Sequence, residues 1–179
     1  MTKRQPPLSS LWLISDARND AGLERALARL PRGSGFVYRH YHLPAAARRA
    51  RFAVLARAAR RRGVWVVLAG TMGEARRWGA DGAYGPARQV APGAAGLRLI
   101  TAHGLREIAA ARRASAVLLS PVFATRSHPG AATLGPVRWR LLAARAGVPV
   151  VALGGMTHRR ARQLGCAHWA AIDGLAGDS

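Results

Sequence analysis

Short apolar runs recur along the chain and alternate with segments in which apolar residues return at helical spacing. A continuous apolar run of about four to eight residues is typical of a strand buried on both faces, whereas the helical period is typical of an amphipathic helix. The predicted strands are 11–15, 35–39, 64–69, 82–84, 97–101, 116–120, 148–153 and 168–172. The predicted helices are 22–30, 45–62, 72–78, 105–113, 136–145 and 157–164.

Strands that alternate with helices favour a parallel sheet with right-handed crossovers. Eight of them favour closure over an open sheet, so we expect a compact α/β fold, the (β/α)₈ or TIM barrel. An internal echo agrees with closure, because residues 61–67 and 145–151 share a pattern and lie four βα units apart. Residues 85–96 read as a loop and only a stub follows residue 172. Helices 4 and 8 are therefore expected to be short or missing.

The length of 179 residues and a hydrophobic fraction of 50% suffice for one domain with a substantial core. We expect a single domain, 1–179, with residues 1–10 as a flexible N-terminal tail. No apolar run approaches the roughly 20 residues of a membrane span. The apolar run 11–14 is too short for the core of a signal peptide. A cytoplasmic protein without a membrane partner is the expectation.

Arginine dominates the charge, since the formal net charge is +20 and Lys3 is the only lysine. In the segment 45–62, Phe52, Leu55 and Ala59 share one helical face, while most arginines lie elsewhere. Aromatic residues do not interleave with basic ones on strands, and no zinc-finger or helix-turn-helix signature is present. We expect no specific nucleic-acid binding, only the salt-sensitive polyanion binding of any basic surface.

In a barrel of this kind the functional residues lie at the carboxyl ends of the strands. The loop 120–130 combines hydroxyls, glycines, Arg126 and His128, so its donors can converge on an anion. Gly154 and Gly155 follow another strand and open a helix, where backbone N–H groups can reach a phosphate. The alternatives are a surface loop without a ligand and a simple turn capped by Thr157.

Several motifs resemble one family. The loop Ser-Pro-Val-x-x-Thr-x-Ser-His-Pro-Gly-Ala from Ser120 is similar to the strand-6 loop of thiamine-phosphate synthases and TenI-like thiazole tautomerases. It looks closest to the synthase-like domains fused to some Nudix hydrolases. The resemblance continues through Leu-Trp-Leu-Ile-Ser-Asp from Leu11, Gly-Ala-Asp-Gly from Gly79 and Ala-Leu-Gly-Gly-Met from Ala152, and it covers nearly the whole chain.

The resemblance implies a site for a small phosphorylated thiazole or pyrimidine ligand. His103 matches the histidine that transfers protons in the tautomerases, although a capping role before the next helix is the alternative. His128 stands where synthases carry a lysine for pyrophosphate, and Asp173 stands beside the phosphate, where a carboxylate needs a cation to offset it. The other implied substrate-binding residues are Arg39, Thr101, Thr125, Ser127, Gly154, Gly155 and Ile172.

Members of this family use Mg²⁺, which prefers carboxylate oxygens and substrate phosphates as ligands. The strand-3 motif Asn-Asp is replaced here by Ala69-Gly70, and Arg88 stands in the segment after strand 4 where an aspartate is expected. We therefore assign no metal ligand and expect a degenerate Mg²⁺–pyrophosphate site. The resemblance leaves open a synthase, a tautomerase and a catalytically silent binder, and it leaves open a separate Nudix-type hydrolase as a partner of the last. A homodimer is also left open.

Overall fold

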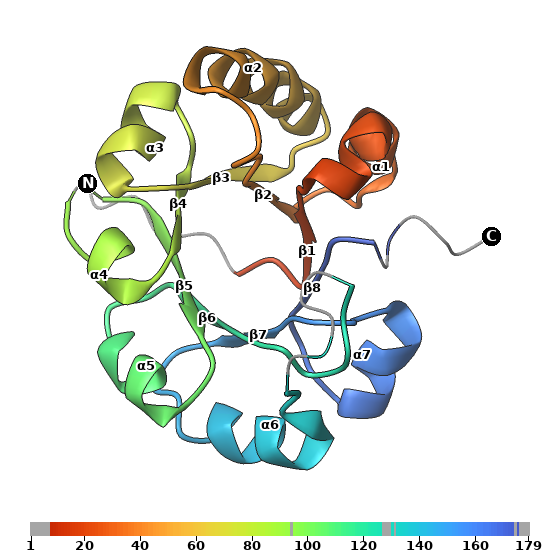
Figure 1. Cartoon of the computed structure of the whole chain (residues 1–179), viewed down its shortest axis with the longest axis vertical. Helices are drawn as coiled ribbons and strands as arrows, with labels where there is room; N and C mark the ends of the chain where they lie inside the picture. The colour runs from red at the N-terminus through yellow and green to blue at the C-terminus, as the bar shows by residue number, and fades with distance from the viewer. Residues whose placement is uncertain (1–7, 94, 127–129, 131, 174, 176–179) are drawn as a thin grey trace.

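The computed structural model describes residues 8–93, 95–126, 130, 132–173 and 175. Within them, parallel strands pair in sequence order, and the last strand pairs back on the first to close a barrel (Figure 1). This confirms the expected TIM barrel. The strands are β1 (Leu11–Ile14), β2 (Gly35–Tyr38), β3 (Trp65–Ala69), β4 (Gly82–Gly85), β5 (Leu97–Ala102), β6 (Ala116–Leu119), β7 (Val150–Ala152) and β8 (Trp169–Ala171).

Helices form a ring outside the strands (Figure 1). They are the 3₁₀ helix η1 (Ala17–Gly22) and the α-helices α1 (Leu23–Arg29), α2 (Ala45–Arg61), α3 (Met72–Trp78), α4 (Ala87–Val90), α5 (Leu105–Ala110), α6 (Gly135–Ala143) and α7 (His158–Leu164). The fourth helix is a single turn, as the segment 85–96 predicts. The eighth helix was expected to be short or missing, and the stretch after residue 172 where it would stand lies largely outside the described residues. No described helix combines the length and hydropathy that a bilayer crossing requires.

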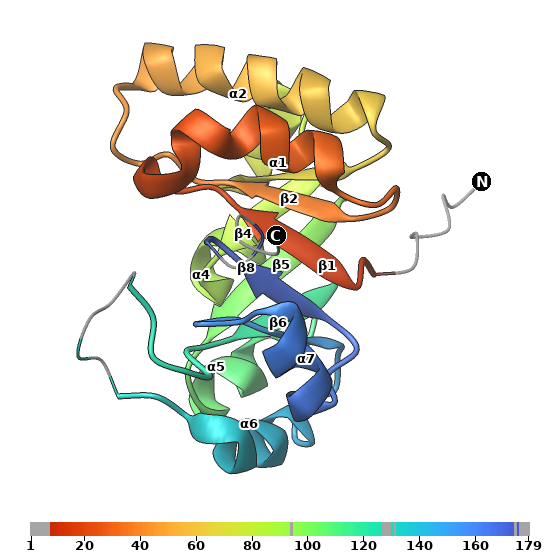
Figure 2. The same cartoon turned by 90° about the vertical axis from the view of Figure 1, so that its right-hand side faces the viewer.

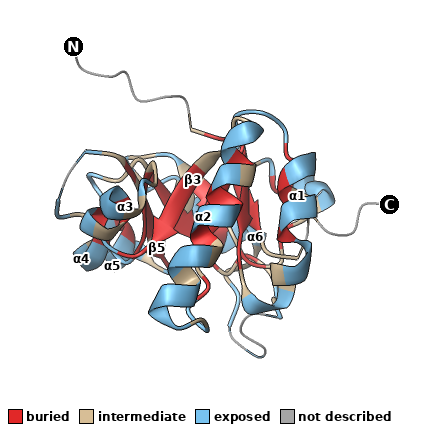
Figure 3. Cartoon of the chain, turned by 90° about the horizontal axis from the view of Figure 1, so that it is seen from above, coloured by how far each residue is buried: buried red, intermediate tan, exposed pale blue. Residues whose placement is uncertain are grey.

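The strands are buried, while the outer faces of the helices are exposed (Figure 3). One cluster of apolar side chains fills the barrel interior, and a second packs between the strands and the helices. Trp12 is the largest residue of the interior cluster, and its ring occupies the space that a side chain at Gly35 would need. A bulky residue on β1 is thus accommodated by a glycine on β2, as close packing requires.

Ser9 and Ser10, which we expected to belong to a flexible tail, are hydrogen-bonded to the barrel. Ser9 is buried, and its hydroxyl donates a 2.6 Å hydrogen bond to the carbonyl oxygen of Gly33. The indole N–H of Trp12 donates to the carbonyl of Ser9 at 2.9 Å, and the amide of Trp169 donates to Ser10 at 2.9 Å. These bonds tie residues 8–10 to the amino end of the barrel, because buried polar groups need partners. Residues 1–7 lie outside the described part.

The arginine-rich segment forms the amphipathic helix that its pattern predicts. Phe52, Leu55, Ala56 and Ala59 of α2 are buried against the barrel. The arginines at 49, 57, 60 and 61 are exposed on the outer surface of the same helix. Most of the positive charge of α2 therefore lies on its solvated outer face. Two further arginines of this helix, described below, turn inward instead.

Candidate functional site

A cavity of about 820 Å³ opens at the carboxyl end of the barrel. This is the end that carries the loop after β6, opposite the end at which the chain enters β1 (Figure 2). Side chains alternate along a strand, so residues two positions apart point to the same side. A residue two positions beyond one in the barrel interior therefore points into this mouth. The cavity is lined in this way by Arg39, Tyr84, Thr101, Leu153 and Ile172.

The loops after β6 and β7 are bonded to each other along one side of the cavity. The amides of Val122 and Phe123 donate to the carbonyls of Leu153 and Gly154 at 2.9 and 3.1 Å. A Cβ atom at Gly154 would lie 2.7 Å from Pro121, and one at Gly155 would lie 2.4 Å from the carbonyl oxygen of Ala124. Both glycines also have positive φ angles, 97° and 60°. Only glycine fits here, so the backbone itself forms the wall of the cavity.

Arginine side chains border this wall. Arg160 of α7 donates to the carbonyl of Gly155, and its guanidinium lies 4.7 Å from the ring centroid of Phe123. Arg126 extends from the β6 loop and is 79% exposed. Thr125 lines the cavity beside it. Ser127 and His128, which the family resemblance also places here, lie outside the described residues.

Asp173 is the acidic residue among the described residues that line the cavity. Its Oδ2 atom lies 3.3 Å from Arg18 of η1 and 3.3 Å from Arg126. Arg18 also pairs with Asp16. Partial burial of the Asp16 carboxyl raises its pKa, but the hydrogen bonds and charge of Arg18 outweigh burial, so the pKa of Asp16 is lowered. Asp173 thus has two cationic neighbours that offset its charge.

His103 follows β5 and lines the cavity. Its Nδ1 atom lies 2.7 Å from the carbonyl oxygen of Ser120, and a carbonyl only accepts, so Nδ1 carries the hydrogen. In the neutral imidazole, Nε2 is then the basic nitrogen. The side chain does not cap α5, whose N-cap is Gly104. The alternative expectation, that the His103 side chain caps this helix, is therefore not what the structure shows.

The opposite side of the cavity, near the ends of β2, β3 and β4, is lined by Arg39, Tyr41, Tyr84, Gly85 and Pro86. Burial raises the pKa of Tyr84, although the nearby guanidinium of Arg39 acts in the other direction. In the part of the chain that is described, no three His, Cys, Asp or Glu side chains gather closely enough to hold a metal ion. The donors on this side are cationic or phenolic, so they do not fit Mg²⁺.

A closed barrel of parallel strands ringed by helices, with its cavity at the carboxyl ends of the strands, is the architecture of a TIM-barrel protein. The model of the thiamine monophosphate synthase family matches residues 11–175. The chain therefore belongs to this family. No curated protein matches it.

Solved structures of low sequence identity share the fold. A thiamine phosphate pyrophosphorylase from Pyrococcus furiosus is 20% identical with a TM-score of 0.74, over 96% of this chain and 89% of that one. One from Bacteroides thetaiotaomicron is 16% identical with a TM-score of 0.62, over 93% and 84%. A citrate synthase variant also aligns, at 11% identity and a TM-score of 0.61, over 92% and 86%. The fold alone therefore does not define the chemistry.

The cavity brings together every predicted site residue that the structure describes: Arg39, Thr101, His103, Thr125, Gly154, Gly155, Ile172 and Asp173. It adds Arg160, which the sequence reasoning missed although it stands on the first turn of the helix that follows Gly155. Tyr84 of β4 also lines the cavity, as its place at the carboxyl end of a predicted strand leads us to expect.

Proposed function

We propose that this protein binds a small heterocycle carrying a monophosphate, of the thiazole phosphate type, in the cavity at the barrel mouth. The observation that carries the proposal is the glycine wall formed by the β6 and β7 loops, with Thr125, Arg126 and Arg160 around it. Backbone N–H groups, a hydroxyl and guanidinium groups are the donors that a phosphate requires. The remaining wall is largely apolar and suits the ring of the ligand.

We propose further that the second half of the site works without Mg²⁺. The synthase reaction joins a thiazole phosphate to a pyrimidine diphosphate and releases pyrophosphate, so it needs compensation of the charge on the leaving group. Arg39 is available for this, whereas the ends of β3 and β4 provide Ala69, Gly70 and Gly85 in place of carboxylates. Without a metal, synthase turnover should be at least about 10²-fold slower, several kcal/mol in transition-state stabilisation.

The test is a titration of the purified protein with thiazole phosphate, pyrimidine diphosphate and thiamine phosphate, each with and without Mg²⁺. Isothermal calorimetry and thermal shift should detect binding of thiazole phosphate that Mg²⁺ does not change. Formation of thiamine phosphate is followed in parallel. Robust synthesis that requires Mg²⁺ would contradict the metal-free site, and the absence of thiazole phosphate binding would contradict the proposal as a whole.

A second candidate function is a proton-transfer isomerisation of a thiazole carboxylate phosphate. It is favoured by the geometry of His103, whose Nδ1–H is held by the carbonyl of Ser120 while Nε2 remains the basic nitrogen. Such a tautomerisation removes a proton from one carbon of the ligand and returns one to another, so it needs neither a metal nor a leaving group. Binding without turnover in either assay would identify a silent binder instead.

A further inference from the structure

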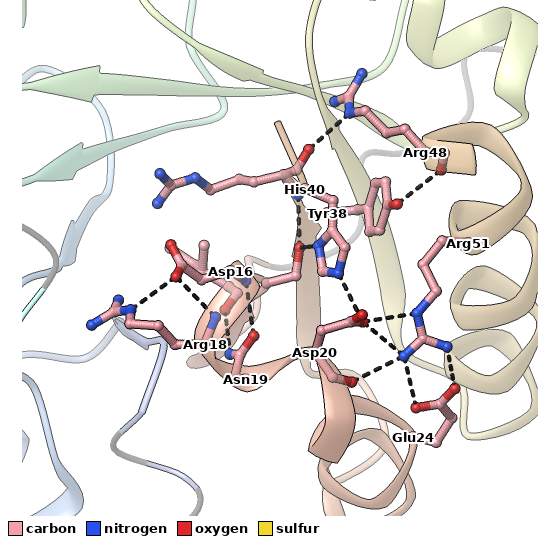
Figure 4. Close-up of polar contacts among 12 residues, drawn as sticks. Asp16, Arg18, Asn19, Asp20, Glu24, Tyr38, His40, Arg48 and Arg51 are labelled. Atoms are coloured by element: carbon pink, nitrogen blue, oxygen red, sulfur yellow. Dashed lines mark hydrogen bonds and ion pairs between the residues drawn. The ribbon is translucent and has the colours of Figure 1, made fainter. Parts of the chain in front are cut away.

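A chain of polar side chains lies behind the barrel mouth, between the ends of β1 and β2 and the helices outside them (Figure 4). Ser15 Oγ lies 2.8 Å from His40 Nδ1, and His40 Nε2 lies 2.8 Å from Asp20 Oδ1. Arg51 of α2 donates from Nε to the same Asp20 oxygen at 2.8 Å, and it also pairs with Glu24 of α1. The chain thus links two strand ends to three helices.

The partners fix the direction of each hydrogen bond. An ionised carboxylate only accepts, so the hydrogen between His40 and Asp20 is on Nε2 of the imidazole. Nδ1 then accepts the hydroxyl hydrogen of Ser15, and the Ser15 oxygen remains free to accept the backbone N–H of Arg39, 2.8 Å away. The pKa of His40 agrees with a neutral ring, since burial lowers it although Asp20 opposes this effect.

Ser15, His40 and Asp20 have the connectivity of a hydrolytic triad, but their position excludes nucleophilic attack. The Ser15 side chain is completely buried and is absent from the cavity lining, so no substrate carbonyl can reach it. Its oxygen instead accepts the backbone N–H of Arg39. The hydrogen bond from the Arg39 amide to Ser15 thus connects the three residues to a residue that lines the cavity.

The peptide groups on both sides of Arg39 are held by side chains. The N–H is bound by Ser15, and the carbonyl accepts a 2.8 Å hydrogen bond from Nε of Arg48. Arg48 is itself anchored to the carbonyl of Ala69 at 2.6 Å and packs 5.2 Å from the ring centroid of Trp78. Strand alternation then turns Ser15 and His40 outward and the Arg39 side chain into the cavity, whose lining includes Arg39 but neither Ser15 nor His40.

The conformation of the residue after Arg39 also indicates that side-chain contacts hold this part of the backbone. His40 has a φ of 42°, in the left-handed region that residues other than glycine enter uncommonly, although histidine does so more often than most. Its ring is stacked 4.7 Å from Tyr38 and bonded at both nitrogens. Bonds of this kind can maintain a local conformation that the backbone alone does not favour.

We propose that Ser15, His40 and Asp20 are positioning residues for Arg39, fixing the backbone from which its guanidinium enters the cavity although none of them touches a ligand. The consequence for ligand binding rests on the proposed function, whereas the order of Arg39 itself does not. Removal of the Ser15 hydroxyl should therefore weaken the binding of an anion only as long as Arg39 is present.

The test is a double-mutant cycle with inorganic pyrophosphate as the probe, measured by calorimetry without metal. We expect Arg39→Ala to weaken binding roughly tenfold and Ser15→Ala roughly threefold, and the double variant to match Arg39→Ala alone. Ser9→Ala, which removes another buried serine hydroxyl at the far end of the barrel, is the matched control. If Ser15→Ala weakens binding equally in the Arg39→Ala background, its role is merely structural and the proposal is overturned.

A second measurement needs no ligand. Amide hydrogen exchange at Arg39 should accelerate at least roughly tenfold in Ser15→Ala, while the amides of β3 keep their protection. His40→Asn retains an acceptor near Ser15 and tolerates positive φ, so it should preserve more Arg39 protection than His40→Ala. If the wild type binds no anion, the proposed function fails, and the exchange experiment alone then tests whether Ser15 positions Arg39. Unchanged exchange at Arg39 in Ser15→Ala would overturn the positioning role.

Discussion

The carboxylate of Asp173 lies 3.3 Å from the guanidinium of Arg126. The acidic residue of the cavity wall is therefore already paired with one of the cations that a phosphate would use. Arg18 approaches the same oxygen from the other side at 3.3 Å. Arg126 is 79% exposed, so this ion pair is weak and can exchange for a pair with a ligand. A phosphate bound as proposed would therefore compete with Asp173 for Arg126 and would also be repelled by this carboxylate.

Replacement of Asp173 should strengthen phosphate binding. Two charges about 4 Å apart in water interact by about 1 kcal/mol, which corresponds to roughly fivefold in affinity. We expect Asp173→Asn to lower the Kd for thiazole phosphate by about this factor, measured by calorimetry at low salt, and the gain to shrink as salt is added.

The control for this prediction is Asp16→Asn. Asp16 pairs with the same Arg18 but does not line the cavity, and asparagine can still cap η1. The affinity should therefore remain within about twofold of the wild type. Weaker binding by Asp173→Asn would contradict the competition and would mean that the carboxylate contacts the ligand directly.

Gly155 should tolerate no side chain. Its φ of 60° costs any other residue roughly 1–2 kcal/mol, and an added Cβ would lie 2.4 Å from the carbonyl of Ala124. We expect Gly155→Ala to lower the melting temperature by roughly 6 °C or more and to abolish measurable thiazole phosphate binding, because the wall of the cavity must shift.

Two further glycines separate the causes of this effect. Gly79 has a φ of 73° but open space around it, so Gly79→Ala should show only the conformational cost, about 3–6 °C, with binding unchanged. Gly147 has neither a left-handed φ nor a close neighbour, so Gly147→Ala should be neutral or slightly stabilising. Equal melting temperatures for Gly155→Ala and Gly79→Ala would refute the steric part of the argument.

The sequence predicts the barrel well because its signal is local. Each strand is a continuous apolar run and each long helix has a repeating apolar face, as Phe52 and Leu55 of α2 illustrate. Even the short fourth helix follows from the local richness in Pro, Gly and Ala around α4. The predicted cavity residues come together for the same reason, since all stand at or just beyond the carboxyl ends of strands.

The parts that the sequence does not predict depend on contacts between distant positions. Ser15 and His40 are 25 residues apart, and neither has a feature that names the other as its partner. The inward turn of Arg160 toward Gly155 depends on the ring of Phe123 beneath it. The order of residues 8–10 depends on Gly33 and Trp169, which only the closure of the barrel brings near. Local patterns do not encode such pairings.

His40 should make stability depend on pH below neutrality. Burial lowers its pKa in the folded protein, a tendency that Arg51 and His42 reinforce and Asp20 opposes, whereas the unfolded chain titrates near the ordinary value of 6.5. As pH falls below about 6.5, the unfolded state takes up the proton first, so the free energy of unfolding decreases. Full stability is present above this pH and is lost toward the folded pKa.

The measurement is the denaturant midpoint between pH 7.5 and about 4.5, compared with His40→Asn. The variant should be less stable throughout but should lose less between pH 6.5 and 5, because the titrating group is gone. The lowered pKa of Asp20 acts in a separate window, below its ordinary value of 3.8. Parallel curves for the two proteins would contradict a neutral, buried His40.

His103 should be the base of any proton transfer in the cavity. The carbonyl of Ser120 fixes the tautomer in which Nε2 is basic, so His103→Ala should slow tautomerisation or proton exchange of thiazole carboxylate phosphate by about 10²- to 10⁴-fold. The Kd for the ligand should change less than about threefold, because a base acts in the transition state rather than in binding. Exchange is followed by NMR in deuterated water.

The matched control is His168→Ala, because Nδ1 of His168 also lies close to a backbone carbonyl. That carbonyl belongs to Ser9, 3.0 Å away at the far end of the barrel. Exchange that proceeds equally in His103→Ala would assign the base elsewhere, and a wild type that binds without exchange would leave the silent binder as the function.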